Sequence, residues 1–192
     1  MRLNAQRADR PAFARSGPAP ISGVSADEAC LRAFQDELDY IYRTLKRLGA
    51  PSSDVEDLIQ DVFLVLRGCW ARCDKSRPLR PFLFAIAFRI VAAHRRKRTR
   101  EVPFGVMELA DAHVDLDADL RSTQARRLIL AALDRVPLPR RAVLIMHELD
   151  GLPVADVAIA LKIPRFTVYG RLRKARRELA SAVRRLLKGA ER

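Results

Sequence analysis

Apolar residues recur every three or four positions along most of the chain, which is the period of amphipathic α-helices. The first stripe runs from Ala26 to Leu48 and ends at Gly49-Ala50-Pro51, a sequence that stops helices. The second begins at Ser53-Asp54-Val55-Glu56, which has the form of a capping box, and continues to about Arg67. Its inward positions are Leu58, Val62, Val65 and Leu66, and its outward positions are Asp54, Asp57, Gln60 and Asp61.

A third helix is predicted from Phe82 to about Arg100, after a polar loop that contains Pro78 and Pro81. The first half of this helix is almost wholly apolar, and its second half carries the run His94-Arg95-Arg96-Lys97-Arg98. The next segment, 101–120, has no firm period and holds six acidic residues with no Lys or Arg. It therefore reads as an acidic linker.

Helicity resumes near residue 121 and is interrupted at Val136-Pro137-Leu138-Pro139, after which a helix from Arg140 to Leu149 is predicted. Leu152 to Arg177 then has the pattern of a helix-turn-helix. Its first helix would bury Val154, Val157, Ala158 and Leu161; Ile163 would fill the turn, and Val168 and Leu172 would bury the second helix. Lys162 stands where a glycine would permit a left-handed backbone.

These elements predict an all-α protein with two small helical domains joined by a flexible acidic linker. We expect a disordered tail over 1–24, which is rich in Arg, Ala, Pro, Ser and Gly, then a domain over 25–100, the linker over 101–120, and a second domain over 121–189.

The net charge of +13 indicates an anionic partner such as nucleic acid. The charge is segregated, because residues 162–192 alone hold eleven Lys or Arg against two Glu. Three cysteines, an odd number, fit a reducing cytoplasm better than a disulfide framework. No apolar run approaches the length of a membrane span, and the N-terminus lacks a secretory signal, so no membrane insertion is expected.

The basic second helix of the helix-turn-helix is the strongest candidate for binding DNA. Its buried positions leave Arg165, Phe166, Thr167, Tyr169, Arg171 and Arg173 for a DNA groove. Arginine can pair with guanine or hold phosphate, and Thr or an aromatic ring can touch a thymine methyl. The alternative is a helical hairpin with a solvated basic face.

Two further surfaces are candidates for binding. Trp70, Phe82, Phe84 and Phe88 lie near dense positive charge, which suits unstacked bases, although most of these rings are better explained as core. The run Arg95–Arg100 alone could equally be a solubilising helix end. The acidic positions 54–61 would repel phosphates and indicate a docking face for a protein, with a plain solvated helix face as the alternative.

Catalysis finds little support in the sequence. Three scattered histidines, no Gly-rich phosphate loop and no nucleophile motif argue against an enzyme. Cys69 and Cys73 have no histidine at metal-ligand spacing, so we expect structural or free thiols, no metal and no cofactor.

Several motifs in order resemble the sigma factors of bacterial RNA polymerase. Asp54 to Phe63 is similar to the polymerase-binding helix (region 2.2). Pro81 to Ile90 and the following basic run are similar to the melting and −10-recognition helix (regions 2.3 and 2.4), and Leu133 to Leu179 resembles region 4. Regions 1.1 and 3 have no counterpart, which is the architecture of the extracytoplasmic-function group (group IV).

The resemblance implies specific roles for individual residues. The set that would face the clamp helices of the largest polymerase subunit is Asp54, Asp57, Gln60, Asp61 and Phe63. The loop from Trp70 to Pro78 would capture a flipped base of the −10 element. The upstream −10 contacts would come from Phe88, Arg89, Ala92, Arg95 and Arg96, and residues 165–176, including Arg176, would enter the groove of the −35 element.

Some positions depart from the family pattern. The family often has Asn at Arg89 and Asp at Ala93, and in region 4 it commonly has Gly at Phe166, a basic residue at Tyr169 and Ser at Gly170. Base specificity is therefore not transferred from the family to this chain.

The preferred interpretation is a cytoplasmic, non-enzymatic specificity subunit that binds core RNA polymerase, recognises two promoter elements and assists DNA melting. Members of this group are commonly held by an anti-sigma protein, so such a partner is a further expectation. The first alternative is a stand-alone helix-turn-helix regulator, which leaves the acidic positions without a purpose. A basic RNA-binding protein explains the charge alone.

Overall fold

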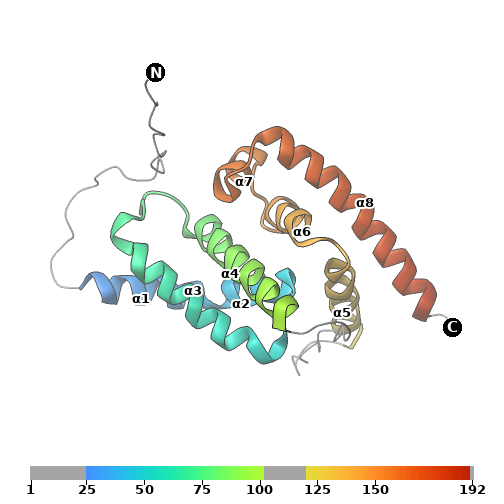
Figure 1. The fold of residues 1–192 in the computed structure, drawn as a ribbon, viewed down its shortest axis with the longest axis horizontal. Helices are drawn as coiled ribbons and strands as arrows, with labels where there is room; N and C mark the ends of the chain where they lie inside the picture. The colour runs from blue at the N-terminus through green and yellow to red at the C-terminus, as the bar shows by residue number, and fades with distance from the viewer. Residues whose placement is uncertain (1–24, 102–119, 191–192) are drawn as a thin grey trace, which may run out of the picture.

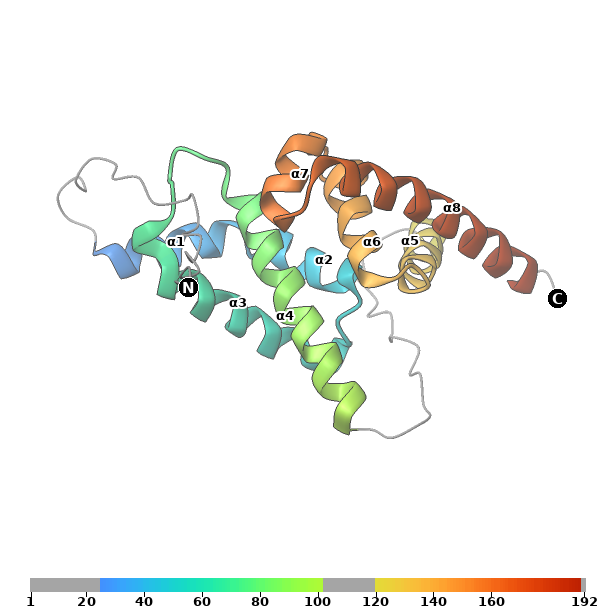
Figure 2. The ribbon, with the colours of Figure 1, turned by 45° about the horizontal axis from the view of Figure 1, so that its top comes forward.

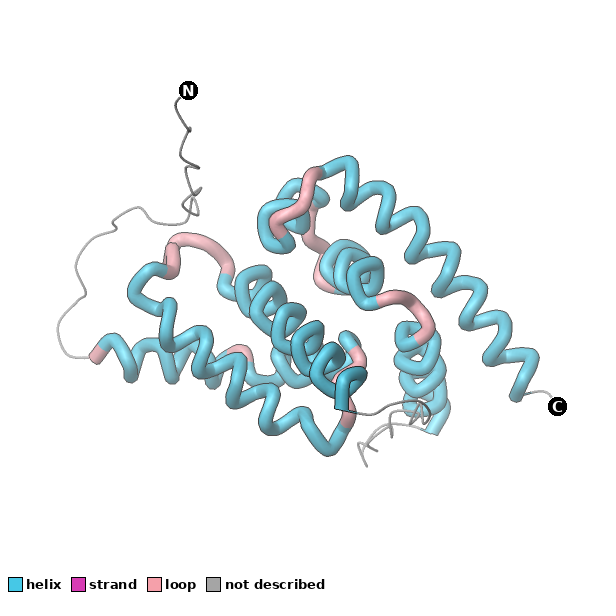
Figure 3. The backbone as a smooth tube through the Cα atoms, in the orientation of Figure 1, coloured by secondary structure: helices cyan, strands magenta, loops and turns pink. Residues whose placement is uncertain are grey.

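The computed structural model describes residues 25–101 and 120–190, so the expected N-terminal tail and all but the ends of the expected linker lie outside the described residues. Within those two ranges the chain forms helices and no strand (Figure 1, Figure 3). The first range contains α1 (Ala26–Asp36), α2 (Leu38–Leu48), α3 (Val55–Cys69) and α4 (Leu79–Glu101). The second contains α5 (Leu120–Asp134), α6 (Leu138–Leu144), α7 (Val154–Leu161) and α8 (Arg165–Ala190). The all-α prediction is confirmed.

The sequence-predicted helix over 26–48 is divided at Glu37, where the chain leaves the helical conformation for one residue. No glycine or proline marks this break in the sequence. The amide of Glu37 donates to the carbonyl of Phe34, and its carboxylate accepts from Arg80 on α4 at 2.8 Å. Leu31 and Leu38, which belong to the apolar stripe over 26–48, are both exposed.

The predicted capping box at the start of α3 is not formed. A short 3₁₀ turn, Ser52–Asp54, precedes the helix, and Asp54 is its N-cap without a side-chain capping bond. The Ser53 hydroxyl instead donates to the Asp54 carboxylate at 2.6 Å. Of the four predicted inward positions on α3, Leu58, Val62 and Leu66 are buried, whereas Val65 is 47% exposed. The buried stripe follows steps of four residues, and Val65 lies about 100° away from Leu66 around the helix.

The middle of α4 is enclosed on every side. Leu83, Phe84, Ala85, Ile86 and Ala87 are consecutive and all buried, and five successive residues cover more than one full helical turn. The helices that surround α4 are α2 and α3 from its own unit and α7 from the other (Figure 2). This apolar stretch of α4 is therefore buried on all sides, and part of its burial comes from packing against the second helical unit.

The two helical units pack against each other rather than standing apart. Besides the contact of α7 with α4, α5 and α6 lie against α2, and buried residues of both units form one continuous hydrophobic core. α8 runs along α5, α6 and α7 and closes the outer side of the second unit (Figure 1).

The helix-turn-helix has the predicted form. Val157, Ala158, Val168 and Leu172 are buried, whereas Val154 and Leu161, also expected inside, are half-buried. The amide of Ile163 donates to the carbonyl of Ala158 to close the turn. Lys162 has φ 54° and ψ 47°, so it adopts the left-handed conformation expected at this position. A residue with a Cβ atom is strained there by about 1–2 kcal/mol.

Replacing Lys162 with glycine is expected to raise the free energy of unfolding by about 0.5–1 kcal/mol, because the relieved strain exceeds the extra chain entropy of glycine. Urea denaturation followed by circular dichroism measures the change. The control is Lys174→Gly, at an exposed right-handed position inside α8, which should lose about 1 kcal/mol. Equal destabilisation by both variants would contradict the prediction.

Candidate functional site

The outward side of α3 presents an acidic surface. Asp57, Gln60 and Asp61 are exposed, while the opposite side of the helix is buried through Val55 and Leu58. The spacing of three and four residues places the three polar side chains on one face. We call this set, Asp57, Gln60 and Asp61, the acidic face.

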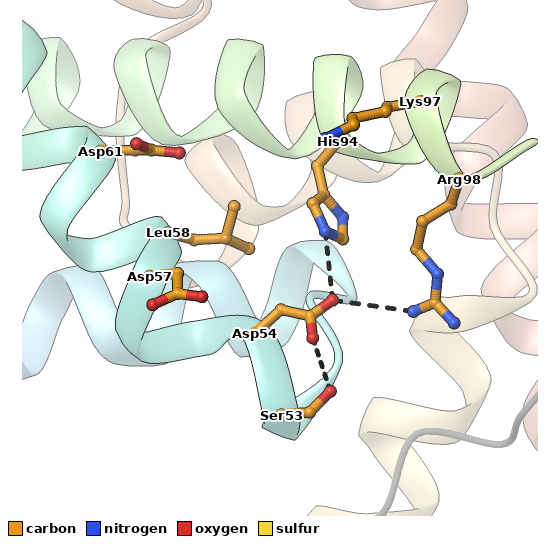
Figure 4. A pocket seen from close by; sticks show the side chains of 8 residues that line it. All are labelled: Ser53, Asp54, Asp57, Leu58, Asp61, His94, Lys97 and Arg98. Carbon is orange, nitrogen blue, oxygen red and sulfur yellow. Dashed lines mark hydrogen bonds and ion pairs between the residues drawn. The ribbon is translucent and has the colours of Figure 1, made fainter. Parts of the chain in front are cut away.

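Asp54 belongs to the edge of this surface and is turned toward α4. Its carboxylate lies 3.1 Å from Nε2 of His94 and 3.8 Å from Nη1 of Arg98 (Figure 4). A hollow of about 470 Å³ opens between the two helices at this point. Its lining residues are Ser53, Asp54, Asp57, Leu58, Asp61, His94, Lys97 and Arg98. Acids from α3 and bases from α4 therefore line opposite walls of a polar groove, which suits a polar protein surface better than an apolar one.

Phe63 does not share the acidic face. Its ring is half-buried and tilted against Phe34 of α1, with centroids 5.0 Å apart, and the Arg67 guanidinium lies 6.0 Å from its centroid. Phe63 thus packs between α1 and α3 in this structure, and its predicted contact with the polymerase stays a prediction.

Trp70 is also placed differently from the prediction. The side chain is 9% exposed and belongs to the core, and Lys75 lies over the ring at 5.2 Å from its centroid. Its indole N–H has no hydrogen-bond partner. The ring of Trp70 therefore serves as a core residue in this structure, and its predicted contact with the −10 element stays a prediction.

The basic half of α4 divides into an outward and an inward part. Arg89 and Arg96 are exposed, and Phe88 and Ala92 are half-buried beside them, at helical spacings that place these four predicted residues on one side. Arg95 lies at the edge of this side, and its guanidinium reaches the end of α2. Its Nη2 donates to the carbonyls of Leu48 and Gly49 at 2.9 and 3.2 Å, and burial lowers its pKa. Arg95 thus makes a structural contact with the end of α2, and its predicted contact with the −10 element stays a prediction.

The start of α8 carries the most exposed aromatic side chains of the described residues. Phe166 is 76% and Tyr169 61% exposed, next to the exposed Arg165 and Arg173, while Thr167 and Arg171 are half-buried. The buried Val168 and Leu172 fix the rotation of the helix and aim these residues outward. Arg176 differs, because Glu148 accepts from its Nε and Nη2 at 2.9 and 2.5 Å.

The cysteines lie at the junction of α1 and α3. Cys30 is buried, and the Cys73 thiol donates to the carbonyl of Cys69 at 3.4 Å. Burial and the neighbouring Cys69 raise the pKa of Cys73 to about 12, so this thiol is protonated at neutral pH. Over residues 25–101 and 120–190, no group of His, Cys, Asp and Glu is arranged to hold a metal ion, and no helix is long and apolar enough to cross a membrane.

Comparison with known protein families gives two matches, and neither family is one of enzymes. Residues 33–101 match the model of sigma-70 region 2, and residues 126–179 match that of sigma-70 region 4. Among curated proteins, the chain is 28% identical to the RNA polymerase sigma factor NccH of Alcaligenes xylosoxydans, over 84% of this chain and 96% of that protein. It is also 28% identical to the ECF RNA polymerase sigma factor SigC of Mycobacterium tuberculosis, over 78% of each chain.

Two solved structures share the fold. One is the sigma factor RpoE in complex with the anti-sigma factor NepR from Bartonella quintana, with a TM-score of 0.58, 20% identity and coverage of 80% of this chain and 98% of that one. The other is CnrH in complex with the cytosolic domain of CnrY, also with a TM-score of 0.58, at 23% identity over 85% of this chain and 93% of that one.

The contrast between buried and exposed aromatic residues predicts different effects of truncation. Trp70→Ala is expected to lower the free energy of unfolding by about 3–5 kcal/mol, because it empties a core position. Phe166→Ala should change it by less than about 0.5 kcal/mol, because its ring is in water. Urea denaturation of both variants tests the assignment, and a large loss for Phe166→Ala would contradict it.

Proposed function

The chain belongs to the extracytoplasmic-function group of the sigma-70 family and is a sigma factor of RNA polymerase, and we propose how its surfaces divide that work. The acidic face of α3 binds the core enzyme. The outward side of α4 contacts the −10 element, and the start of α8 contacts the −35 element. Region 2 and region 4 are both matched, which disfavours a stand-alone helix-turn-helix regulator.

The observation that carries the proposal is the separation of charge on the folded chain. Asp57 and Asp61 are exposed on α3 of a strongly basic protein, whereas Arg89 and Arg96 are exposed on α4. Exposed carboxylates would weaken binding to DNA, and they would strengthen binding to a protein surface of opposite charge. Asp57, Gln60 and Asp61 therefore dock on a basic surface of the polymerase, with Asp54 at the edge.

On the DNA side, Arg89, Ala92 and Arg96 with Phe88 form the −10 contact, and Arg165, Phe166, Thr167, Tyr169, Arg171 and Arg173 form the −35 contact. The arginines supply phosphate contacts and groove hydrogen bonds, and the two exposed rings supply apolar contacts such as thymine methyls. Arg176 would join this set only after leaving Glu148.

The protein acts in the cytoplasm as a non-enzymatic specificity subunit, without a cofactor. An anti-sigma protein is a further partner in this proposal, because RpoE was solved with the anti-sigma factor NepR, and CnrH with the cytosolic domain of CnrY. The direct test of the whole function is run-off transcription with purified core polymerase on genomic fragments. The expected result is a set of promoter-specific transcripts that are absent without the protein.

Charge reversal of the acidic face, Asp57→Lys with Asp61→Lys, is expected to abolish binding to core polymerase while the fold is retained. Both positions are exposed, so the change acts on the partner rather than on the core. The measurement is the dissociation constant for fluorescently labelled protein and core polymerase.

The matched control is Asp36→Lys with Asp39→Lys, which makes the same change of charge at exposed positions of α1 and α2. This variant should bind core polymerase nearly as the wild type does. If the Asp57 and Asp61 variant also binds with unchanged affinity, the assignment of the acidic face is wrong.

Removing the exposed Arg173 is expected to weaken binding to a −35 duplex and to lower the slope of log K against log salt by about 0.9, the loss of one phosphate contact. Phe166→Ala should weaken binding with the slope unchanged, because its ring carries no charge. Fluorescence anisotropy at several salt concentrations separates the two. An unchanged slope for Arg173→Ala would contradict its role as a phosphate contact.

A further inference from the structure

The outward side of α8 stays basic beyond the residues assigned to the −35 contact. The exposed cations of its C-terminal half are Arg177, Arg184, Arg185 and Lys188, and we call this set the distal stripe. The opposite side of the helix is buried through Ala175 and Ala182. The match to region 4 ends at residue 179, so it assigns no role to residues 184–188.

The distal stripe points the same way as side chains assigned to DNA. Phe166 and Arg184 are eighteen residues apart, which is about five full turns, so they leave the helix in the same direction. Arg177 and Lys188 lie within about 40° of that direction, and Arg185 lies at its edge. α8 is one uninterrupted helix over these positions (Figure 1). A duplex held by the start of α8 therefore lies on the side that carries the distal stripe.

The length of α8 carries the distal stripe past the groove. Its 26 residues make a rod about 39 Å long. The major groove is about 12 Å wide, whereas residues 165–176 alone cover about 17 Å. The distal stripe begins at the next residue and extends about 17 Å further. Beyond the edge of a groove, the part of a duplex that a helix meets first is the phosphate backbone.

The cations of the distal stripe have no acidic partner within the fold, unlike two other arginines of this unit. Arg140 donates to Glu178 at 2.8 Å, and Arg176 donates to Glu148 at 2.5 Å. Over residues 25–101 and 120–190, the side chains of the distal stripe form no ion pair or hydrogen bond. Glu178 is the single acid of α8, and it is turned toward Arg140. An uncompensated row of exposed cations attracts a polyanion, and phosphates that bind it release their counterions.

We propose that the distal stripe is a second DNA contact of α8, which holds the phosphate backbone of the duplex beside the −35 element. The proposal rests on the −35 contact proposed above, because that contact brings the duplex to α8. Phosphates are the same in every sequence, so the distal stripe adds affinity without reading bases. A straight helix diverges from a straight duplex, so the contact is favoured where the flanking duplex bends toward α8.

The test compares three duplexes cut from a promoter that run-off transcription has identified. The shortest ends at the edges of the −35 element, and the other two are extended on one side or the other by about 10 base pairs, one helical turn. Fluorescence anisotropy of the full chain is measured at several salt concentrations. The wild type should bind one extended duplex more tightly than the shortest. The slope of log K against log salt should be steeper on that duplex by about 0.9 for each added phosphate contact.

Arg184→Gln with Lys188→Gln removes two charges of the distal stripe and leaves the −35 contact in place. This variant should lower the slope on the favoured duplex by about 1.8 and bind the shortest duplex as the wild type does. The swap Arg184→Lys with Lys188→Arg keeps both charges and should retain the slope. The matched control, Arg127→Gln with Arg135→Gln, removes two exposed charges of the same unit outside α8 and should keep the difference between the duplexes.

The proposal is overturned if the wild type gains nothing from either extension, or if the glutamine variant loses as much on the shortest duplex as on the extended one. Equal losses in the control would overturn it too, because overall charge would then explain the binding. If the wild type binds the shortest duplex no better than one with a scrambled −35 element, the proposed −35 contact is wrong instead. The two failures are distinguishable, since one depends on the length of the duplex and the other on its sequence.

Discussion

The guanidinium of Arg141 has no exposure to water, and its bonds to the end of α2 constrain the elements around it. Burial lowers its pKa to about 10, so the group stays charged at neutral pH and must be compensated by the protein. Asp134, the carbonyl of Leu48 and the carbonyl of Val136 provide that compensation, while one terminal nitrogen, Nη2, has no partner. A buried charge that loses its partner strongly destabilises the fold, so these bonds hold α2, α5 and α6 in fixed positions relative to one another.

The same end of α2 also binds part of the basic run on α4. Arg89 and Arg96 point outward, but Arg95 shares the Leu48 carbonyl with Arg141. Like charges repel, and Arg95 contributes to the lowered pKa of Arg141, so Asp134 is needed between them. One helix thus combines the proposed nucleic-acid surface with a structural cation.

Local periodicity was enough to predict most of the helices and the helix-turn-helix, because each depends on residues within a few positions of one another. The break at Glu37 between α1 and α2 had no such local signal. Long-range packing decides where the aromatic candidates lie, since α1 covers Phe63 and Trp70 lies in the core. The partner of Arg95 lies 47 residues earlier in the chain, and that of Tyr40 lies 110 residues later. No sequence pattern reveals such pairings, and none marked the interface between the units.

Polar contacts and apolar packing contribute differently to the interface between the two units. An apolar interface resists separation in proportion to the surface it exposes, about 25 cal/mol per Å². A buried ion pair behaves differently, because hydration of the separated charges offsets much of the attraction that is lost when they part. Burial raises the pKa of Asp150, which means that removing its charged carboxylate from water costs free energy. Arg141, Asp134 and Asp150 therefore fix how the two units are arranged, while the continuous hydrophobic core and the packing of α7 on α4 stabilise the interface.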